Sequence, residues 1–136
     1  MKSNEILKFF KENPVQYLST IGLDGKPKVR PFQFMLEEKG KLYFCTCNKK
    51  RVFEEMKGNP YVEFCVMDKN MNWLRTSGKG IFVEELSIKK KIIESNKLVK
   101  EIYKSYDNPI FEVFYLEETN FSMNYMAEIM EQESKF

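Results

Sequence analysis

Residues 42–56 read LYFCTCNKKRVFEEM, a strand pattern that changes into a helix pattern at three consecutive cations. The first half contains β-branched, aromatic and small residues without charge, which is typical of a buried strand. The second half has apolar residues at helical spacing, namely Val52, Phe53 and Met56. A Gly-Asn-Pro run at residues 58–60 ends this helix, and we expect Asn48 to be its N-cap. The sequence therefore predicts a strand followed directly by a short helix.

The three cations, Lys49, Lys50 and Arg51, lie at the start of the predicted helix. Positive charge there opposes the helix dipole and is unfavourable by a few tenths of a kcal/mol per residue. Free N–H groups and the dipole make a helix start a favourable place for a phosphate. A solvated basic turn is the commoner meaning of such a run. Because these cations lie at the unfavourable end of the helix, the pattern favours a phosphate site.

Length and composition limit the class of protein. The 136 residues predict one domain, residues 1–126, followed by a polar tail, residues 127–136, that frays. The net charge of +2 gives no general attraction to nucleic acid, and no apolar run is long enough to cross a bilayer. The N-terminal residues lack the pattern of a signal peptide. We expect a cytoplasmic protein that binds neither nucleic acid nor membrane.

The chain contains no histidine, which excludes a Ser-His-Asp triad, an imidazole base and a histidine metal site. Its three cysteines, Cys45, Cys47 and Cys65, do not have the spacing of a zinc site, and we expect no metal. Cys45 and Cys47 share one face of a strand, where a disulfide would strain the backbone. We expect reduced, packed thiols, and a reactive thiol beside Lys49 is the alternative. Chemistry must come from carboxylates, lysines, tyrosines or a borrowed cofactor.

The rest of the chain predicts a small antiparallel barrel with few helices. Helices are expected near residues 3–13 and 86–105, the first as a lid on the barrel and the second broken near residues 95–96. Strands are expected at residues 16–21, 28–36, 42–47, 61–67 and 72–84, and in a last hairpin of 110–116 and 121–125.

Prolines and glycines refine this barrel. Pro27 and Pro31 place the second strand at an edge or a bulge, because proline donates no ladder hydrogen bond. Gly78 and Gly80 within one strand indicate a bulge or a barrel corner. We therefore expect a mainly β fold, a closed or split antiparallel barrel of about six strands with flanking helices.

Six ordered segments resemble the pyridoxamine 5'-phosphate oxidase-like FMN-binding split barrels, in particular the branch of nitroimidazole-resistance (Nim-like) proteins. They are YLST (17–20), GKPKVRPF (25–32), KLYFCT (41–46), NKK (48–50), NPYV (59–62) and WLRTSG (73–78). The resemblance covers roughly residues 6–116, and it rests on the order of the segments because each motif is short. It implies a six-stranded split barrel, and a homodimer with two FMN molecules at the interface, each touched by both chains.

The resemblance also implies eleven cofactor-binding positions: Arg30, Pro31, Phe32, Gln33, Cys45, Thr46, Asn48, Lys49, Lys50, Trp73 and Arg75. Arg30 would meet the flavin phosphate or ring edge and stabilise the anionic reduced flavin. A surface ion pair is the alternative, and replacement of Arg30 is expected to leave an edge strand folded.

The other matched positions would contact different parts of the cofactor. The segment 31–33 would run beside the isoalloxazine, and Cys45 and Thr46 would face the ring and ribityl chain. Residues 48–50 would cradle the phosphate, in a register uncertain by one or two positions. Trp73 and Arg75 would add a further flavin contact. Strand aromatics are usually core residues, so only Trp73 and Phe32 are expected to border the ring.

The function implied by the resemblance is that of a flavin-dependent oxidoreductase without a catalytic side chain of its own. Its substrate would be a small molecule such as a nitro compound or a quinone, and NAD(P)H is a candidate electron donor. The arginine- and histidine-bearing C-terminal segment of the vitamin B6 oxidase is missing, and so is the active-site histidine of nitroimidazole reductases. Two other classes stay open: a non-catalytic flavin- or haem-binding module with a storage, sensing or stress role, and a cofactor-free interaction protein.

Overall fold

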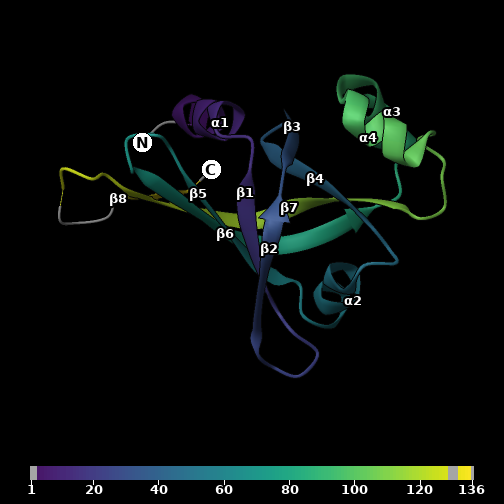
Figure 1. Ribbon diagram of the computed structural model, residues 1–136, viewed down its shortest axis with the longest axis horizontal. Helices are drawn as coiled ribbons and strands as arrows, with labels where there is room; N and C mark the ends of the chain where they lie inside the picture. The colour runs from purple at the N-terminus through teal and green to yellow at the C-terminus, as the bar shows by residue number, and fades with distance from the viewer. Residues whose placement is uncertain (1–2, 129–131, 136) are drawn as a thin grey trace.

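The computed structural model describes residues 3–128 and 132–135, which form an eight-stranded antiparallel sheet and four helices (Figure 1). In chain order the elements are α1 (Ser3–Glu12), β1 (Gln16–Ile21), β2 (Pro27–Phe32), β3 (Phe34–Glu38), β4 (Lys41–Cys47), α2 (Arg51–Gly58), β5 (Tyr61–Met67), β6 (Trp73–Val83), α3 (Leu86–Ser95), α4 (Lys97–Tyr103), β7 (Phe111–Asn124) and β8 (Gln132–Lys135). Among these elements, no helix is long and apolar enough to cross a membrane.

The strand order shows that the sheet is rolled into a barrel. Its main path runs β2-β1-β5-β6-β7-β4-β3, so the two outermost strands are β2 and β3. These strands are consecutive in the chain and are separated only by Gln33. Seven strands laid flat would span roughly 29 Å, which one residue cannot cross. The two edges therefore meet at Gln33, and the prediction of a mainly β split barrel is confirmed.

The barrel interior is filled by aromatic side chains that alternate inward along the strands. The rings of Phe44 and Phe64 stack with centroids 4.1 Å apart, and Phe114 stacks on Phe44 at 5.5 Å. Helix α1 places Ile6 and Phe10 in this cluster, each 1% exposed. The first helix thus closes the barrel as the sequence predicts.

A second hydrophobic cluster lies on the other face of β4 and β7. It consists of Tyr43, Cys47, Ile88, Ile92, Ile93, Val99, Tyr103, Phe111 and Val113. Helices α3 and α4 supply the isoleucines, Val99 and Tyr103, and they lie to one side of the barrel in Figure 1. The predicted break in this helical region is confirmed, since Asn96 caps α4 by accepting a hydrogen bond from the Val99 amide.

The predicted strand 28–36 is wrong as one element, because the chain changes partners at Gln33. β2 pairs with β1, whereas β3 pairs with β4. The side chain of Gln16, which is fully buried, covers the gap that this change leaves in the ladder. Its Oε1 accepts a hydrogen bond from the Phe34 amide at 2.6 Å, and its Nε2 donates to the Asn13 carbonyl at 2.7 Å.

The predicted last hairpin is also wrong, because residues 111–124 form one long strand. β7 pairs with β6 over most of its length, and the register shifts between Ser77 and Lys79. A Cβ on Gly78 would lie 2.9 Å from the Glu117 carbonyl oxygen, so the glycine allows this close approach. The expectation of a bulge in β6 is confirmed, and the bulge lets β7 continue where the sequence predicts a turn.

The C-terminal residues contain a strand where fraying is predicted. β8 pairs with residues 120–123 of β7. β4 covers the same strand only at residues 111–115, so β8 pairs with a part of β7 that β4 does not reach. The barrel with this addition has eight strands instead of about six.

Candidate functional site

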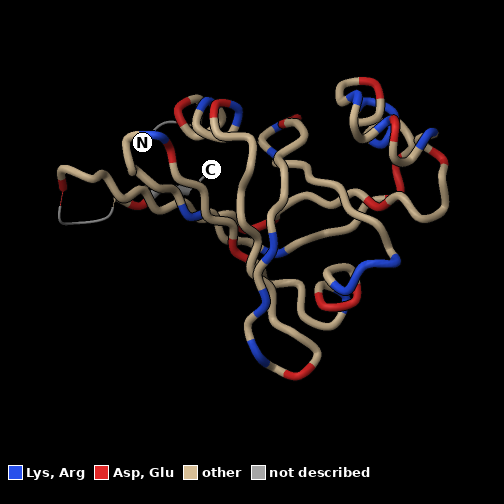
Figure 2. Tube along the Cα trace, viewed as in Figure 1, with Lys and Arg blue, Asp and Glu red and all other residues tan. Residues whose placement is uncertain are grey.

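The turn from β4 into α2 carries the basic run. The side chains of Lys49, Lys50 and Arg51 are exposed, and Figure 2 shows them as a continuous basic stretch that leads into the helix. Among the residues that the structure describes, no acidic side chain forms an ion pair with any of the three. The turn is therefore a concentration of positive charge without a close ion pair, and Glu54 is the acidic residue in the first turn of the same helix.

The start of α2 is not capped by a side chain. Lys50 takes the N-cap position with φ −91° and ψ 150° and forms no side-chain cap hydrogen bond. The prediction that Asn48 is the N-cap is wrong, because its amide donates to the Pro109 carbonyl at 2.8 Å and to Glu112 Oε2 at 2.7 Å. The first amides of an uncapped helix lack intrahelical acceptors, so they add to the anion-attracting character of the turn.

Thr46 and Cys45, just before the turn, face opposite sides of β4. Thr46 is 3% exposed, and its Oγ1 has no hydrogen-bond partner in the described protein. A buried hydroxyl without a partner is unfavourable, so a ligand that supplied one would be stabilised there. Cys45 packs against the second hydrophobic cluster instead. Its thiol points away from the side on which Thr46 lies.

Burial also determines the chemistry of Cys45. It raises the pKa of this thiol to about 12, although the charge of Lys50 acts in the opposite direction. A reactive role is thereby disfavoured for Cys45, because the thiolate is the nucleophile. The thiol that contacts Lys49 is that of Cys47, which is buried and accepts a hydrogen bond from the Lys49 backbone amide at 3.4 Å.

Cys45 is therefore expected to resist alkylation in the native protein. With a pKa of about 12, roughly one thiol in ten thousand is ionised at pH 8. Native labelling with iodoacetamide, followed by peptide mass spectrometry, should modify Cys45 only after denaturation. The variant Cys45→Ala should show the same native labelling rate as the wild type. Rapid native modification of Cys45 would contradict its assignment as a packed, neutral thiol.

Arg30 lies on the edge strand β2, as the sequence predicts, but its side chain turns inward. Its guanidinium donates to Thr20 Oγ1 at 2.7 Å and to Glu55 Oε1 at 2.5 Å. The Arg30 side chain is 24% exposed and that of Glu55 only 6%. The ion pair is thus largely buried and is not a surface pair. Thr20 on β1 and Glu55 on α2 were not predicted from the sequence as partners of Arg30. The sequence does contain a signal for this pair, because Glu55 lies on the same helix face as the apolar Val52 and Met56 and is therefore expected to be buried.

The three residues after Arg30 lie in different surroundings. Phe32 packs in the barrel, with its ring centroid 5.9 Å from those of Phe64 and Phe114, so its side chain is partly buried against the core. Pro31 and Gln33 are exposed along the seam where β2 and β3 meet. Because successive side chains of β2 point to opposite faces, the two prolines and Val29 lie on the outer face, away from the inward side chains.

Trp73 and Arg75 lie far from the basic turn along the sheet. Trp73 pairs with Asn124, whereas Cys47, next to the turn, pairs with Phe111 at the other end of β7. These two ends are about 40 Å apart along the strand. Arg75 lies over the Trp73 ring at 5.1 Å, and its Nε is 3.6 Å from Glu63 Oε1. The described chain therefore does not bring all eleven predicted positions together.

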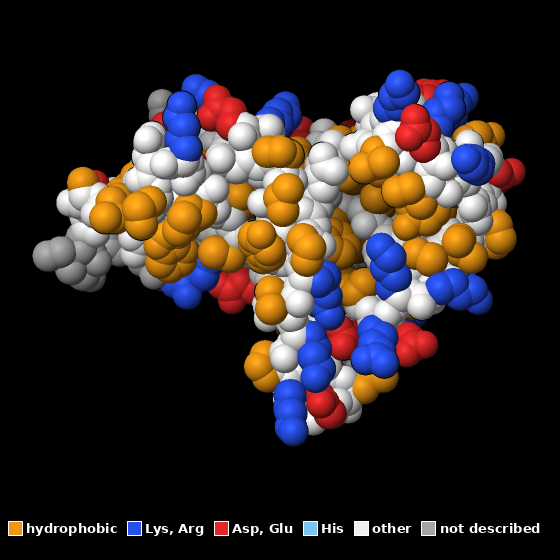
Figure 3. All heavy atoms as spheres, in the orientation of Figure 1, with side chains coloured by type: hydrophobic (Ala, Val, Ile, Leu, Met, Phe, Trp, Pro, Cys, Tyr) orange, Lys and Arg blue, Asp and Glu red, His pale blue; other side chains and the backbone are white. Residues whose placement is uncertain are grey.

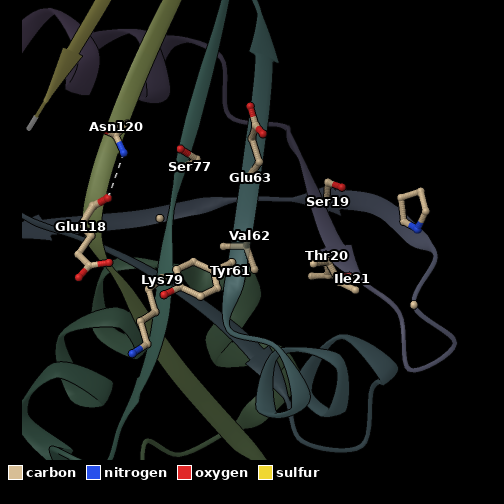
Figure 4. Close-up of a pocket in the computed structure, with 13 residues that line it drawn as sticks. Ser19, Thr20, Ile21, Tyr61, Val62, Glu63, Ser77, Lys79, Glu118 and Asn120 are labelled. Atoms are coloured by element: carbon tan, nitrogen blue, oxygen red, sulfur yellow. Dashed lines mark hydrogen bonds between the residues drawn. The ribbon is translucent and has the colours of Figure 1, made fainter.

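A hollow that was not predicted from the sequence lies on the outer face of the sheet. It has a volume of about 520 Å³ and is lined by β1, the turn into β2, and strands β5, β6 and β7 (Figure 4). Tyr61 and Lys79 lie side by side there as register partners, and Glu63 faces Ser77 two positions further along the same strands. Polar and apolar side chains thus alternate across an open concave surface.

Several large apolar side chains are exposed on this outer face. Tyr17, Val29, Tyr61 and Met67 are each more than half exposed. Hydrophobic side chains also gather over β2 and its neighbours in Figure 3. An apolar surface of this kind is typical of an interface.

The comparisons with known proteins agree on one family. Residues 3–122 match the profile of a family described as pyridoxamine 5'-phosphate oxidase. A NimC/NimA family protein from Clostridium acetobutylicum is 31% identical, and the match covers 98% of this chain and 91% of that one with a TM-score of 0.88. The search of curated proteins found no match.

Two more distant structures show the fold alone. General Stress Protein 26 from Bacillus anthracis is 18% identical, and the match covers 98% of this chain and 97% of that one with a TM-score of 0.79. A heme binding protein from Mycobacterium smegmatis is 11% identical, and the match covers 99% of this chain and 58% of that one with a TM-score of 0.76. The chain thus shares its fold with a general stress protein and with a heme binding protein.

Proposed function

Because the chain belongs to the pyridoxamine 5'-phosphate oxidase-like family of FMN-binding split barrels, we propose that it is an FMN-dependent oxidoreductase acting on a small molecule. A nitro compound or a quinone fits such a flavoprotein, and NAD(P)H is the proposed electron donor.

The observation that carries the proposal is the basic turn at the start of α2, whose three cations form no close ion pair among the described residues. Three exposed cations without acidic partners, next to uncapped helix amides, form a fitting cradle for a phosphate monoester. Thr46, two residues before the turn, adds a buried hydroxyl that lacks a partner. Lys49, Lys50 and Arg51 would hold the phosphate, and Thr46 would hydrogen-bond the ribityl chain beside it.

The protein would contribute binding and orientation, and the bound flavin would supply the hydride chemistry. The cations of the turn anchor one end of the cofactor, which fixes the direction in which the rest extends. Without histidine, the chain offers no imidazole to move a proton near neutral pH. Substrate protons would therefore come from water or from groups that titrate well away from neutrality.

The geometry of β7 supports a cofactor site shared by two chains. Within one chain the basic turn and Trp73 lie at opposite ends of β7, about 40 Å apart along the strand, so we do not expect one FMN molecule to contact both. A second copy of the chain could bring its own Trp73 and Arg75 to the turn. The exposed apolar outer face offers the surface for this pairing. We therefore propose a homodimer in which each site uses both chains.

The purified protein is expected to be a dimer. Multi-angle light scattering at micromolar concentration should give about twice the chain mass of 16.3 kDa. Replacing Tyr61 and Met67 with Lys should shift the equilibrium towards the monomer, because charge would enter the apolar face. A stable wild-type monomer that still binds flavin would contradict the shared site.

The absorbance spectrum of the purified protein tests the cofactor directly. A flavin spectrum, with release of FMN on denaturation, would support the proposal. Oxidation of NAD(P)H in the presence of a nitro compound or a quinone would then support the oxidoreductase. Bound flavin without any turnover would instead favour a storage or sensing role. A colourless protein that does not take up added FMN would contradict the proposal.

A further inference from the structure

Asn48 ties the basic turn to the loop that leads from α4 into β7. Its backbone amide donates to the Ile110 carbonyl at 3.0 Å. Its side-chain amide donates to the Pro109 carbonyl at 2.8 Å and to Glu112 Oε2 at 2.7 Å. Both side-chain partners are acceptors, which fixes the orientation of the amide group. Every N–H group of Asn48 thus has an acceptor within residues 109–112, and we call this set of bonds the Asn48 tether.

The loop at the other end of the tether is itself held in place. Asn108 Nδ2 donates to the Tyr103 carbonyl at 2.8 Å, and Asn108 Oδ1 accepts from the Ile110 amide at 3.1 Å. The Phe111 amide donates to the Asn108 carbonyl at 3.0 Å. The rings of Tyr103 and Phe111 are buried, with centroids 4.7 Å apart. Asn48 is therefore bonded to a loop that α4 and β7 brace from both sides.

The charges of the basic turn work against its conformation. Lys49, Lys50 and Arg51 are adjacent like charges, and they lie at the end of α2 where positive charge opposes the helix dipole. Lys50, at the N-cap position, forms no side-chain cap hydrogen bond. The charges therefore disfavour the turn that the structure shows, whereas the Asn48 tether stabilises it.

Glu112 is the charged acceptor of the tether. A carboxylate accepts stronger hydrogen bonds than a neutral carbonyl does. Glu112 on β7 is the register partner of Thr46 on β4, so the two side chains lie on the same face of the sheet. The tether therefore holds the turn next to the residue to which the proposed site assigns the ribityl chain.

We propose that Asn48 is a positioning residue that, through Glu112 and the Pro109 carbonyl, holds the basic turn in the conformation that receives the FMN phosphate. The inference rests on the proposed FMN site and deepens it, because it adds a support from outside the strand and helix that carry the cations. A turn that is ordered before binding loses less conformational entropy when the phosphate enters. Loss of the tether should therefore weaken FMN binding much more than the binding of riboflavin, which has no phosphate.

The first test compares two replacements of Glu112 that remove the same charge, so that any electrostatic effect on the phosphate is common to both. Glu112→Gln keeps an oxygen that can accept from Asn48, whereas Glu112→Ala does not. The riboflavin-to-FMN ratio of dissociation constants should be about fivefold lower in Glu112→Ala than in Glu112→Gln. When each is combined with Asn48→Ala, the two replacements should give equal ratios, because the bond in which they differ is already lost.

The second test needs no flavin. The amides of Asn48, Lys50 and Phe53 all donate to backbone carbonyls, so a peptide covering residues 48–53 reports the order of the turn in hydrogen exchange. Without flavin, this peptide should exchange about fivefold faster in Asn48→Ala than in the wild type. It should also exchange faster in Glu112→Ala than in Glu112→Gln.

Asn96→Ala is the matched control for a general loss of stability. Asn96 accepts a hydrogen bond from the Val99 amide at 3.0 Å at the start of α4, so this variant also loses a bond between an asparagine side chain and the backbone. It should lower the midpoint of denaturant unfolding but leave the ratio and the exchange of residues 48–53 unchanged. Circular dichroism checks that each variant is folded, and if Asn48→Ala is not, the two Glu112 variants decide.

Three results would overturn the role of the tether. Equal ratios in Glu112→Gln and Glu112→Ala would show that Glu112 acts only through its charge. A difference that persists between them in the Asn48→Ala background would show that Glu112 acts without Asn48. Unchanged exchange in Asn48→Ala would show that the turn is ordered without the tether, and it would leave the FMN site itself intact. A wild-type protein that binds neither flavin would instead refute the proposed function, and the phosphate role of Asn48 with it.

Discussion

Replacing Arg30 with Ala is expected to lower the free energy of unfolding by about 2–4 kcal/mol. Removing one partner of a buried ion pair typically costs roughly 3–5 kcal/mol, because the other charge is left buried and unpaired. Here the remaining group is Glu55, whose side chain is 6% exposed. We expect a somewhat smaller loss than for a fully buried pair, because the Arg30 side chain is 24% exposed. Urea unfolding followed by circular dichroism measures the change.

Lys28→Ala provides a matched control on the same strand. Lys28 pairs with Asp24 at 3.2 Å, but both side chains are more than 40% exposed. Exposed pairs contribute about 0–1 kcal/mol, so this variant should be nearly as stable as the wild type. The double variant Arg30→Gln/Glu55→Gln should lose less stability than Arg30→Ala, because no buried charge is left alone. Equal effects of Arg30→Ala and Lys28→Ala would show that the buried pair is not important for stability.

The second large effect is expected for FMN binding. Replacing Lys49 and Lys50 together with Ala should weaken FMN binding by about 2–4 kcal/mol, taking roughly 1–2 kcal/mol for each charge-assisted phosphate contact. Riboflavin binding should hardly change, because riboflavin has no phosphate. Titration calorimetry or the quenching of flavin fluorescence gives both affinities. Arg51 stays in place in this variant, so some selectivity for FMN should persist.

The control for the lysine pair is a double variant on α4. Lys97 and Lys100 are exposed and, like the lysines of the turn, form no ion pair within the described chain. Their replacement with Ala changes the net charge by the same amount but on a different helix. FMN affinity should therefore stay at the wild-type value. If both double variants weaken FMN equally, the effect is one of overall charge, and the turn is only a solvated basic surface.

Much of the fold could be predicted because it depends on local patterns. The strand of residues 42–47 and the helix after it follow from a change in periodicity at Lys49, and strands β1 and β5 were predicted with the bounds that the structure shows. The edge position of β2 follows from its prolines, and the bulge in β6 from Gly78. The family resemblance rests on the same segments and is confirmed by the match over residues 3–122.

The candidate site was only partly predictable. The basic turn was found from three adjacent residues whose charge is unfavourable at a helix start. The role of Asn48 could not be predicted, because its hydrogen-bond partners Pro109 and Glu112 lie more than sixty residues away in the chain. Phe32 shows the same limit, since its packing against Phe64 and Phe114 follows from how the barrel closes.

The sequence by itself determined the strand-to-helix unit at residues 42–56, the cluster of positive charge within it and the absence of imidazole chemistry. These properties belong to neighbouring residues, so no long-range contact is needed to establish them. Only the tertiary structure decided that the chain changes sheet edges at Gln33, that β7 is one strand, and that Arg30 pairs with Glu55, 25 positions away. Each depends on which segments meet when the barrel closes. A buried ion pair forms only where that closure excludes water from both charges.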